Sequence, residues 1–427
     1  MTAKELDAKL NLQAGRPTLK STIDASRARK EYWAGVKEAK RQGKPVVAAF
    51  GLLPREIWHA MGVPVLGMES LALQVAARQL SGRYCQVATE MGFASELCAL
   101  HLSLLGIAGT SQRDAFVEDL LVEPDLIVGS TFACMSESKS FLVWKERLGR
   151  PCHVVDIPIN ASGPGVPGRT VAYVAEELKG LIAFLRSNGF EYDEAKLSQA
   201  VDCSRRTMEL WTRIEECRKA VPAPMGAVDA LLCIGNTLVS LLGTETCVTL
   251  FQSLLDEISS RVSCRRGLLD EERLRLYLVG IPPLYHLDLL DYPAKHGAVV
   301  VKSDLDFFGG CMMSPDLLDP GRPLESLALK QLSDIVNPCF DNKIENAVRT
   351  IREYRIDGVI GLNKRGCRNL PASLRLIKDA AWKGAHIPMA VFDLDGIDPR
   401  EYNDALVKAN VDSFMETLVT SRTGTGI

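Results

Sequence analysis

The sequence predicts an α/β fold with two doubly wound parallel-sheet domains, joined by a helical segment and preceded by a helical N-terminal extension. Three observations predict this fold. Short β-branched runs alternate with helical stretches in two separate parts of the chain, a long stretch with helical periodicity lies between these parts, and 427 residues suffice for two or three domains of about 150 residues each. Strands that alternate with helices form right-handed βαβ units, and such units build a parallel sheet covered by helices on both faces.

The first part of the chain supplies the extension and the first domain. Residues 1–44 are polar and helical in character, with Ala, Lys and Glu concentrated between Glu31 and Lys44. We expect a Rossmann- or flavodoxin-like domain over residues 45–165, closed by the Gly- and Pro-rich stretch SGPGVPG. Its four expected strands are Pro45–Phe50, Pro64–Met68, Leu126–Gly129 and His153–Pro158.

The second part supplies the connecting segment and a second domain of the same type. Residues 166–262 form the connection, because nearly every position from Thr170 to about Val262 fits a helical period. The strand pattern then resumes, so we expect the second α/β domain over residues 263–427. Its four expected strands are Leu274–Ile281, Ala298–Lys302, Asp357–Leu362 and Ile387–Asp395.

The charge balance and the apolar pattern exclude two kinds of partner. Fifty Lys and Arg against fifty-three Asp and Glu give a net charge of −3, so the chain has no basic excess with which to bind a nucleic acid backbone. The N-terminus lacks the apolar core of a signal peptide, and no run reaches about 18 apolar residues. We therefore expect a soluble, cytoplasmic protein without a membrane partner.

Three of the twelve cysteines stand at places where ligand sites form. In parallel sheets such sites lie beyond the carboxyl ends of the strands, and Cys134 and Cys367 each follow an expected strand, in different domains. Cys98 lies in SELCALHL, where we expect Ser95 to cap a helix and to place Cys98 in or near its first turn. Three thiolates without a CxxC pair are unlike a structural zinc site and suit an iron–sulfur cluster with one open iron.

The alternative is that these cysteines share no site, because their spacing alone is not a motif. Most free cysteines are buried core residues. The four on helical patterns fit that interpretation best: Cys203, Cys217, Cys233 and Cys247. The other five are not assigned, although Cys311 in FFGGCMM could lie near the cleft: Cys85, Cys152, Cys264, Cys311 and Cys339.

Other polar residues have both a functional and an ordinary interpretation. Glu56, after the first strand, is a candidate general acid, or else a carboxylate that stabilises a helix dipole. His59 and His101 fit core or surface positions on helices better than ligand positions. Lys139 could pair with a negative group or be an exposed helix lysine. The acidic residues of DLDGID fit capping and turn formation better than magnesium binding: Asp393, Asp395 and Asp398.

Around these loops the chain resembles the family of 2-hydroxyacyl-CoA dehydratase and class I, ATP-dependent, benzoyl-CoA reductase subunits. The resemblance follows the order of six stretches: GLLPREIWHAMGVPV, CQVATEMGFASELCALHLSLLG, GSTFACMSESKSF, KAVPAPMGAVDALL, LNKRGCRNL and IPMAVFDLDGIDPREY. The second, fourth and fifth stretches are most similar to a benzoyl-CoA reductase B-type subunit. Two positions depart from the family pattern, because Met135 stands where Asp is common and Leu100 where Tyr is usual.

The resemblance implies a cofactor, partners and a reaction class. It implies a [4Fe–4S] cluster on Cys98, Cys134 and Cys367, a homologous sister subunit, an acyl-CoA substrate, and a separate ATP-hydrolysing iron–sulfur activator that supplies electrons. The lack of a GxxxxGK[ST] loop in this chain agrees with that division of labour. Reduction of an aromatic acyl-CoA is the first expectation. The alternatives are a 2-hydroxyacyl-CoA dehydratase subunit and a non-catalytic paralogue that stores electrons or stabilises a partner.

Overall fold

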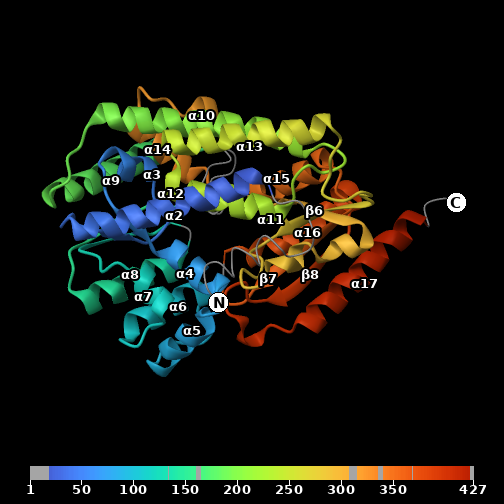
Figure 1. Cartoon of the computed structure of the whole chain (residues 1–427), viewed down its shortest axis with the longest axis horizontal. Coiled ribbons are helices and arrows are strands. Elements are labelled where there is room, and N and C mark those ends of the chain that lie inside the picture. Colours follow the sequence, from blue (N-terminus) through green and yellow to red (C-terminus); the bar gives the residue numbers. More distant parts are fainter. Residues whose placement is uncertain are drawn as a thin grey trace.

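The computed structural model describes residues 19–132, 134–159, 165–306, 315–334, 340–367 and 369–423. These residues form two parallel four-stranded sheets surrounded by helices, as the sequence predicts (Figure 1). Helix α2 (Lys20–Arg41) confirms the expected N-terminal helix. Within the described ranges, every helix is too short or too polar to cross a bilayer.

The first sheet has the strand order β2-β1-β3-β4. Its strands are β1 (Val47–Ala49), β2 (Val65–Gly67), β3 (Leu126–Ser130) and β4 (Cys152–Val155). All four expected strands form, but the first two lose their leading residues. Pro45 and Pro64 stand there, and proline has no N–H to donate to a sheet ladder. The chain reverses its winding direction between β1 and β3, which is where α/β sheets place their ligand crevices.

The second sheet repeats this topology with the order β6-β5-β7-β8. Its strands are β5 (Leu274–Val279), β6 (Ala298–Ser303), β7 (Gly358–Lys364) and β8 (Met389–Leu394). The corresponding switch point lies between β5 and β7. Cys134 follows β3 and Cys367 follows β7, so each of these loops leaves a strand beside a switch point.

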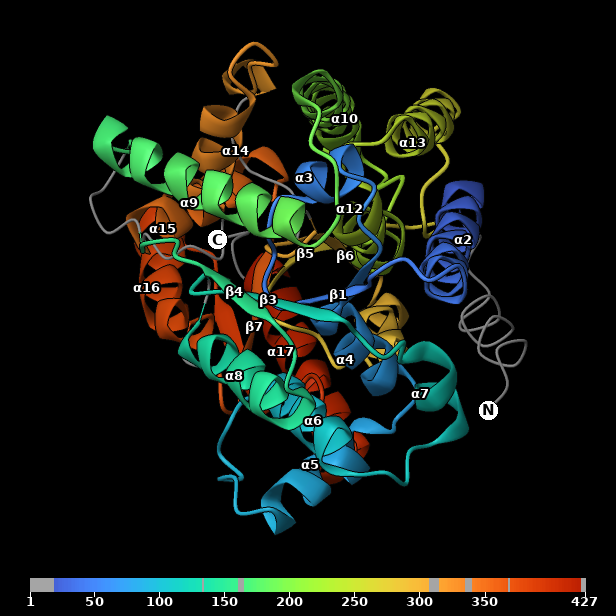
Figure 2. The same ribbon diagram turned by 90° about the vertical axis from the view of Figure 1, so that its left-hand side faces the viewer.

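Helices cover both faces of each sheet, which confirms the doubly wound architecture. In the first sheet, Val47 and Ala49 point into one core, whereas Val46 and Ala48 point into another, because neighbouring side chains of a strand alternate between faces. Figure 2 shows helices α9, α10 and α13 on one side of β1, β3 and β4, and helices α5, α6 and α8 on the other. The helices around the first sheet are α3 (Arg55–Ala60), α4 (Met68–Ala77), α5 (Ser81–Glu90), α6 (Ala99–Gly109), α7 (Ala115–Leu120) and α8 (Met135–Leu148).

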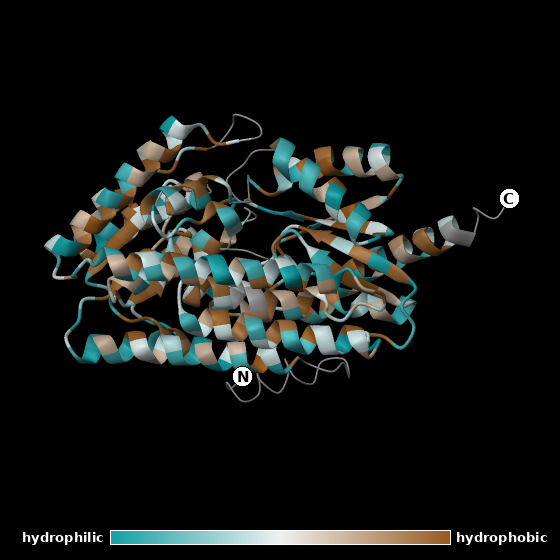
Figure 3. Cartoon of the chain, turned by 90° about the horizontal axis from the view of Figure 1, so that it is seen from above, coloured by the Kyte–Doolittle hydropathy of each residue, from teal (hydrophilic) through white to brown (hydrophobic). Residues whose placement is uncertain are grey.

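The connecting segment is helical as expected. Its helices are α9 (Gly168–Ser187), α10 (Glu194–Arg218), α11 (Ala227–Asp229), α12 (Asn236–Leu241) and α13 (Glu245–Ser263). The long helices that face the viewer in Figure 3 mix hydrophilic and hydrophobic residues along their length, which is the pattern of amphipathic helices with one buried side. Their apolar side chains pack into the same core as Val47 and Val128 of the first sheet.

The last helices complete the second domain and tie it to the first. They are α14 (Pro323–Leu332), α15 (Phe340–Glu353), α16 (Leu374–Ala385) and α17 (Asp404–Thr423). Helices α15 and α16 cover one face of the second sheet, and α17 covers the other. Helix α14 instead packs against α9 and α10, with Leu327 and Leu332 in the core of the first sheet.

Candidate functional site

The first cysteine loop ends at the start of α6. Cys98 is the N-cap residue of this helix, and its carbonyl accepts a hydrogen bond from Leu102 N at 2.9 Å. Ser95 does not cap the helix, so that expectation is wrong: Leu97 N donates to Ala94 O in a separate turn, and Ser95 Oγ donates to Glu96. The half-buried Cys98 sulfur therefore lies at the positive end of the α6 dipole, closer to the terminus than the sequence suggests.

The second cysteine loop joins β3 to α8. Cys134 is the N-cap residue of α8, with extended backbone angles, and its carbonyl accepts a hydrogen bond from Ser138 N at 3.3 Å. Burial raises the pKa of the Cys134 thiol to about 12, and the negative charge of Glu137 acts in the same direction. A bound metal would have to displace the thiol proton, because thiolates, not thiols, are metal ligands.

The third cysteine loop touches the first, although the two belong to different domains. Gly366 precedes Cys367 and has a φ of +67°. A Cβ atom at Gly366 would lie 2.7 Å from Leu97 O and 2.9 Å from Cys98 N, so only glycine fits there. This close backbone approach brings the loop that carries Cys367 directly against the loop that carries Cys98.

Lys364 forms a second link between these two loops. It is the last residue of β7, is 2% exposed, and donates a hydrogen bond from Nζ to Cys98 Sγ at 3.0 Å. Burial alone would lower the pKa of Lys364, but the negative charges of Cys98, Asp395 and Cys367 raise it above its ordinary value. A buried cation therefore lies among the cysteines, and the sequence pattern did not single it out.

His101 joins the first loop to the second. Its ring lies on α6, and Nε2 is 3.8 Å from Cys134 Sγ. Nδ1 is buried and has no hydrogen-bond partner among the described residues. Burial, together with the charge of Lys364, lowers the pKa of His101 to about 3, so the imidazole is neutral near pH 7. His101 is thus a buried histidine, as expected, but it faces a candidate ligand.

Two buried carboxyl groups lie behind Cys134. Glu137, in the first turn of α8, accepts a hydrogen bond from Ser130 Oγ at 3.4 Å, and Glu69 accepts one from Gly51 N at 2.9 Å. Burial raises the pKa of Glu137 well above its ordinary value, and the neighbouring charge of Glu69 adds to this effect. Gly51 has a φ of +95°, and a Cβ there would lie 2.4 Å from Glu137 Oε1.

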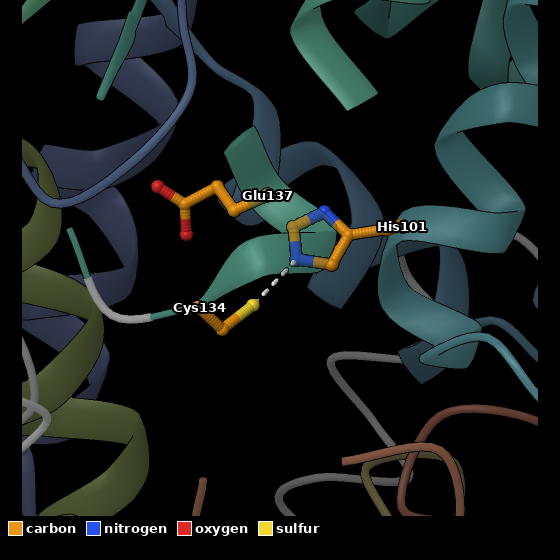
Figure 4. A group of neighbouring side chains, drawn as sticks. All are labelled: His101, Cys134 and Glu137. Atoms are coloured by element: carbon orange, nitrogen blue, oxygen red, sulfur yellow. Dashed lines mark hydrogen bonds between the residues drawn. The ribbon is translucent and has the colours of Figure 1, made fainter. Parts of the chain in front are cut away.

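His101, Cys134 and Glu137 form the tightest set of metal-binding side chains. One ligand atom from each lies within 4.8 Å of the other two, and within the described ranges this is the single group of its kind (Figure 4). Figure 4 shows the Cys134 sulfur directed toward the imidazole across the gap between α6 and α8. Cys98 and Cys367 are outside this group.

The donor set around the loops nevertheless fits an iron–sulfur cluster. Cys98, Cys134 and Cys367 are free, half-buried thiols on three loops that meet between the two domains. A cluster holds its cysteine ligands farther apart than a single ion does, and its charge is balanced by hydrogen bonds to sulfur such as that from Lys364. These residues would hold the group that the sequence implies.

Glu56 lies at the same carboxyl edge of the first sheet but makes contacts of its own. Its side chain, in the first turn of α3, is fully buried and forms an ion pair with Lys330 Nζ at 2.5 Å. Ser204 Oγ donates to the same carboxylate oxygen at 2.6 Å. The second oxygen, Oε2, has no hydrogen-bond partner among the described residues. Glu56 therefore bonds to α10 and α14 rather than to any of the three cysteines.

The remaining candidates have ordinary structural roles. Lys139 is exposed on α8, and His59 hydrogen-bonds the carbonyl of Ser240 at 3.0 Å through Nε2. Asp395 and Asp398 accept hydrogen bonds from backbone N–H groups of the turn they form, which confirms the capping interpretation. The cysteines of α10 to α13 lie on helices or their π-helical turn, as expected: Cys203, Cys217, Cys233 and Cys247. Cys311 and Cys339 are outside the described residues.

A hollow of about 510 Å³ opens beside the first cysteine loop. Thr89, Phe93 and Ser95 line one side, and Asp398 and Arg400, which follow β8, line the other. Arg400 is held by a hydrogen-bonded ion pair with Asp398, at 2.6 Å for the Nη2 contact. The hollow thus lies between the two domains, next to the loop that ends at Cys98.

Two doubly wound domains whose thiol-bearing loops meet at their switch points define an α/β enzyme subunit with a site between domains. The family model for the 2-hydroxyglutaryl-CoA dehydratase D-component matches residues 52–418, and the chain belongs to this family. It is 24% identical to the (R)-phenyllactyl-CoA dehydratase alpha subunit of Clostridium sporogenes, over 90% of this chain and 92% of that one. It is 23% identical to the lactoyl-CoA dehydratase alpha subunit of Anaerotignum propionicum, over 90% and 92%. It is also 24% identical to the B-type subunit of benzoyl-CoA reductase from Thauera aromatica, over 84% and 85%.

Proposed function

We propose that this chain is the iron–sulfur subunit of a low-potential acyl-CoA enzyme, with a [4Fe–4S] cluster held by Cys98, Cys134 and Cys367. The observation that carries the proposal is the contact between the first and third loops, through Gly366 and through the Lys364–Cys98 hydrogen bond. This contact unites cysteines from two domains in one site. We rank reduction of an aromatic acyl-CoA first, because the sequence pattern of the loops is most similar to that branch of the family.

The partners follow from the chemistry that the reaction requires. The cluster would supply single electrons at low potential to a thioester carbonyl or its conjugated ring, and an open iron could polarise the substrate oxygen. We propose that a homologous sister subunit completes the enzyme and that a separate ATP-hydrolysing iron–sulfur activator supplies the electrons. The oxygen sensitivity of such a cluster fits an anaerobic cytoplasm.

The residues around the site would exclude water, hold charge and move protons. Lys364 would neutralise one ligand charge, and the packed faces of α6 and α8 would keep solvent away from Cys134. We propose Glu56 as a proton-transfer residue, because Oε2 is the free oxygen of its otherwise bonded carboxylate. Lys330 and Ser204 would hold that carboxylate in a fixed orientation.

The ligand assignment is tested by iron and acid-labile sulfide per chain after anaerobic preparation. Cys98→Ser, Cys134→Ser and Cys367→Ser should each lose iron, because each removes one thiolate from the cluster. Cys203→Ser and Cys217→Ser, both on α10, are the matched controls and should retain it. Loss of iron in Cys203→Ser combined with full iron in Cys367→Ser would show that the assignment is wrong.

A second candidate is dehydration of a 2-hydroxyacyl-CoA. The observation that favours it is that the relatives named above include dehydratase subunits at 23–24% identity, equal to the 24% of the reductase subunit. Turnover of the assembled enzyme with an aromatic thioester and with a 2-hydroxyacyl thioester separates the two reactions. A cluster-loaded enzyme that turns over neither would support a non-catalytic paralogue.

Glu56→Gln tests the proposed proton transfer. The substitution keeps the shape of the side chain but removes its ability to carry a proton as an acid, so turnover should fall by about a hundredfold or more. Iron content and the thermal midpoint should stay near the wild-type values, since Ser204 can still donate to the amide oxygen. Full turnover in Glu56→Gln would remove Glu56 from the reaction.

A further inference from the structure

The spacing of His101, Cys134 and Glu137 suits a single metal ion better than a cluster. A tetrahedral zinc ion with Zn–S near 2.3 Å and Zn–N near 2.0 Å places its sulfur and nitrogen ligands about 3.6 Å apart. The observed separation of Cys134 Sγ and His101 Nε2 is 3.8 Å. The cysteine sulfurs of a cubane cluster are separated by a whole cluster edge and are much farther apart.

The backbone fixes this spacing without any ion. Cys134 and Glu137 are three positions apart at the start of α8, so both side chains project from one face of the first turn. His101 occupies the first turn of α6, which packs against α8. His101 and Glu137 are both 5% exposed, so neither side chain has much freedom to move away.

The charges and donor types select the kind of ion. One thiolate, one neutral imidazole and one carboxylate are the ligands of a borderline-soft divalent ion such as Zn²⁺, not of Mg²⁺ or Ca²⁺. Thiolate and carboxylate together balance a double positive charge, and the buried Glu69 beside Glu137 adds further negative charge. Lys364, the nearest buried cation, donates to Cys98 and not to Cys134. A water molecule can complete the tetrahedron at the half-exposed side of Cys134.

We propose that the cluster-free chain binds one divalent transition-metal ion, Zn²⁺ or its like, through His101, Cys134 and Glu137. This mononuclear site shares Cys134 with the cluster site but uses neither Cys98 nor Cys367. The two kinds of occupancy exclude each other, because one thiolate cannot serve both. Zinc bound at this site therefore blocks cluster assembly in the chain that carries it. The shared ligand rests on the proposed cluster assignment, whereas the mononuclear site stands on its own geometry.

Cobalt binding tests the site directly. The cluster-free chain, kept anaerobic, is titrated with Co²⁺, which reports a thiolate ligand through an ultraviolet charge-transfer band and tetrahedral geometry through intense visible bands. We expect one Co²⁺ per chain, displaced by Zn²⁺. His101→Ala and Glu137→Gln should each weaken Co²⁺ binding by at least about tenfold. Cys134→Ser should abolish the charge-transfer band.

Cys98→Ser and Cys367→Ser are the matched controls, because they remove thiols of the same region without touching the trio. Both should bind Co²⁺ like the wild type. Near-ultraviolet circular dichroism checks that every variant is folded, and the isosteric Glu137→Gln serves if His101→Ala is not. An unchanged band in both His101→Ala and Glu137→Gln, or a band lost in Cys98→Ser or Cys367→Ser, would overturn the proposal.

Cluster reconstitution separates this proposal from the proposed function. His101→Ala and Glu137→Gln should still incorporate wild-type amounts of iron and sulfide, because the three cysteines are intact. Preloading with one equivalent of Zn²⁺ should slow incorporation in the wild type and not in His101→Ala. Equal slowing in both would overturn the mononuclear site, whereas iron content independent of Cys98 and Cys367 would overturn the cluster assignment and leave the cobalt result standing.

Discussion

Lys364 is the residue that most directly connects the two domains at the thiol site. Its ammonium group is buried, and it finds its hydrogen-bond acceptor in Cys98, 266 positions earlier in the sequence. A buried cation needs nearby negative charge, because desolvation otherwise disfavours the charged form. The side chain therefore has a reason to be there only if negative sulfur ligands surround it.

Replacing Lys364 with Met should make the cluster harder to reduce. Removal of one positive charge at about 5 Å, with an effective dielectric constant near 20, destabilises the added electron by about 3 kcal/mol, or a shift on the order of 100 mV to more negative potential. The measurement is a redox titration of the reconstituted chain followed by electron paramagnetic resonance. Lys139→Met, which removes an exposed lysine five positions after Cys134, is the control and should leave the potential unchanged. A positive shift in Lys364→Met would contradict this electrostatic role.

His59 predicts how stability depends on pH. Burial lowers its pKa to about 4 in the folded chain, against about 6.5 when unfolded. The unfolded state therefore takes up a proton that the folded state refuses, so the contribution is fully present above pH 6.5 and is lost as pH falls toward 4. His59→Gln, which retains a donor for the Ser240 carbonyl, should reduce the acid-induced loss by roughly 3 kcal/mol at pH 4.

Denaturant unfolding at several pH values measures this difference. His386→Asn is the control, because His386 is exposed and has a φ of +55°, which Asn tolerates. We expect the control to keep the wild-type slope between pH 6.5 and 4. The same slope in His59→Gln would remove His59 as the cause.

Three helices that are distant in sequence meet at one buried ion pair. Glu56 on α3 pairs with Lys330 on α14, while Ser204 on α10 donates to the same carboxylate. Gly243 has a φ of +93°, and a Cβ atom there would lie only 3.2 Å from the Cα of Glu56, so the chain passes close to α3 at this point. The pair thus fixes α3 against the helices of the connecting segment and of the second half of the chain.

Lys330→Met should destabilise the fold strongly, because it leaves the Glu56 carboxylate unpaired in a fully buried place. Loss of one partner of such a pair costs about 3–5 kcal/mol. The double variant Lys330→Met with Glu56→Gln should recover much of that loss, since no buried charge remains. Chemical denaturation of both single variants and the double variant measures the coupling. A double variant as unstable as the sum of its single changes would show that the two side chains act independently.

The connecting helices and the first sheet share one core, so they should unfold together. Leu178 of α9, Leu197 of α10 and Leu254 of α13 pack with Val47 and Val128 of the sheet. This sharing leaves no independent apolar core for the connecting helices, and elements with a common core unfold cooperatively.

Single-tryptophan variants test this cooperativity. One variant keeps Trp58 on α3 and the other keeps Trp211 on α10, with the remaining four tryptophans replaced by Phe. Thermal unfolding followed by fluorescence should give the same midpoint from both reporters. A distinct, lower midpoint for Trp211 would mean that the connecting helices unfold as a separate unit.

Helix α10 also joins the connecting segment to the second sheet. Arg218, near its end, is fully buried, forms an ion pair with Asp306 at 2.7 Å and donates to Val301 O at 2.9 Å. Lys302, on the same strand as Val301, pairs with Glu215. Because each buried charge here has an opposite partner, the network can hold α10 against β6 without leaving an uncompensated ion.

Local patterns in the chain were enough to predict the eight strands, the amphipathic helices between them and the family. Strands such as Leu274–Val279 and Ala298–Ser303 form from β-branched runs whose character depends on neighbouring residues alone. The positions of Cys134 and Cys367 after strands were equally predictable, because the carboxyl ends of parallel strands always meet at one edge. Even the turn role of Asp398 follows from the residues next to it.

Which side chains meet across the molecule depends on the packed fold. Lys364 reaches Cys98, Lys330 reaches Glu56, and His101 faces Cys134 because separate helices and sheets pack at particular angles. The Ser95 expectation failed for a related reason, since residues 94–97 form a turn of their own and the helix begins only after Cys98. Periodicity records which face of an element is buried, but it does not record which element covers that face, so contacts between distant segments require the three-dimensional arrangement.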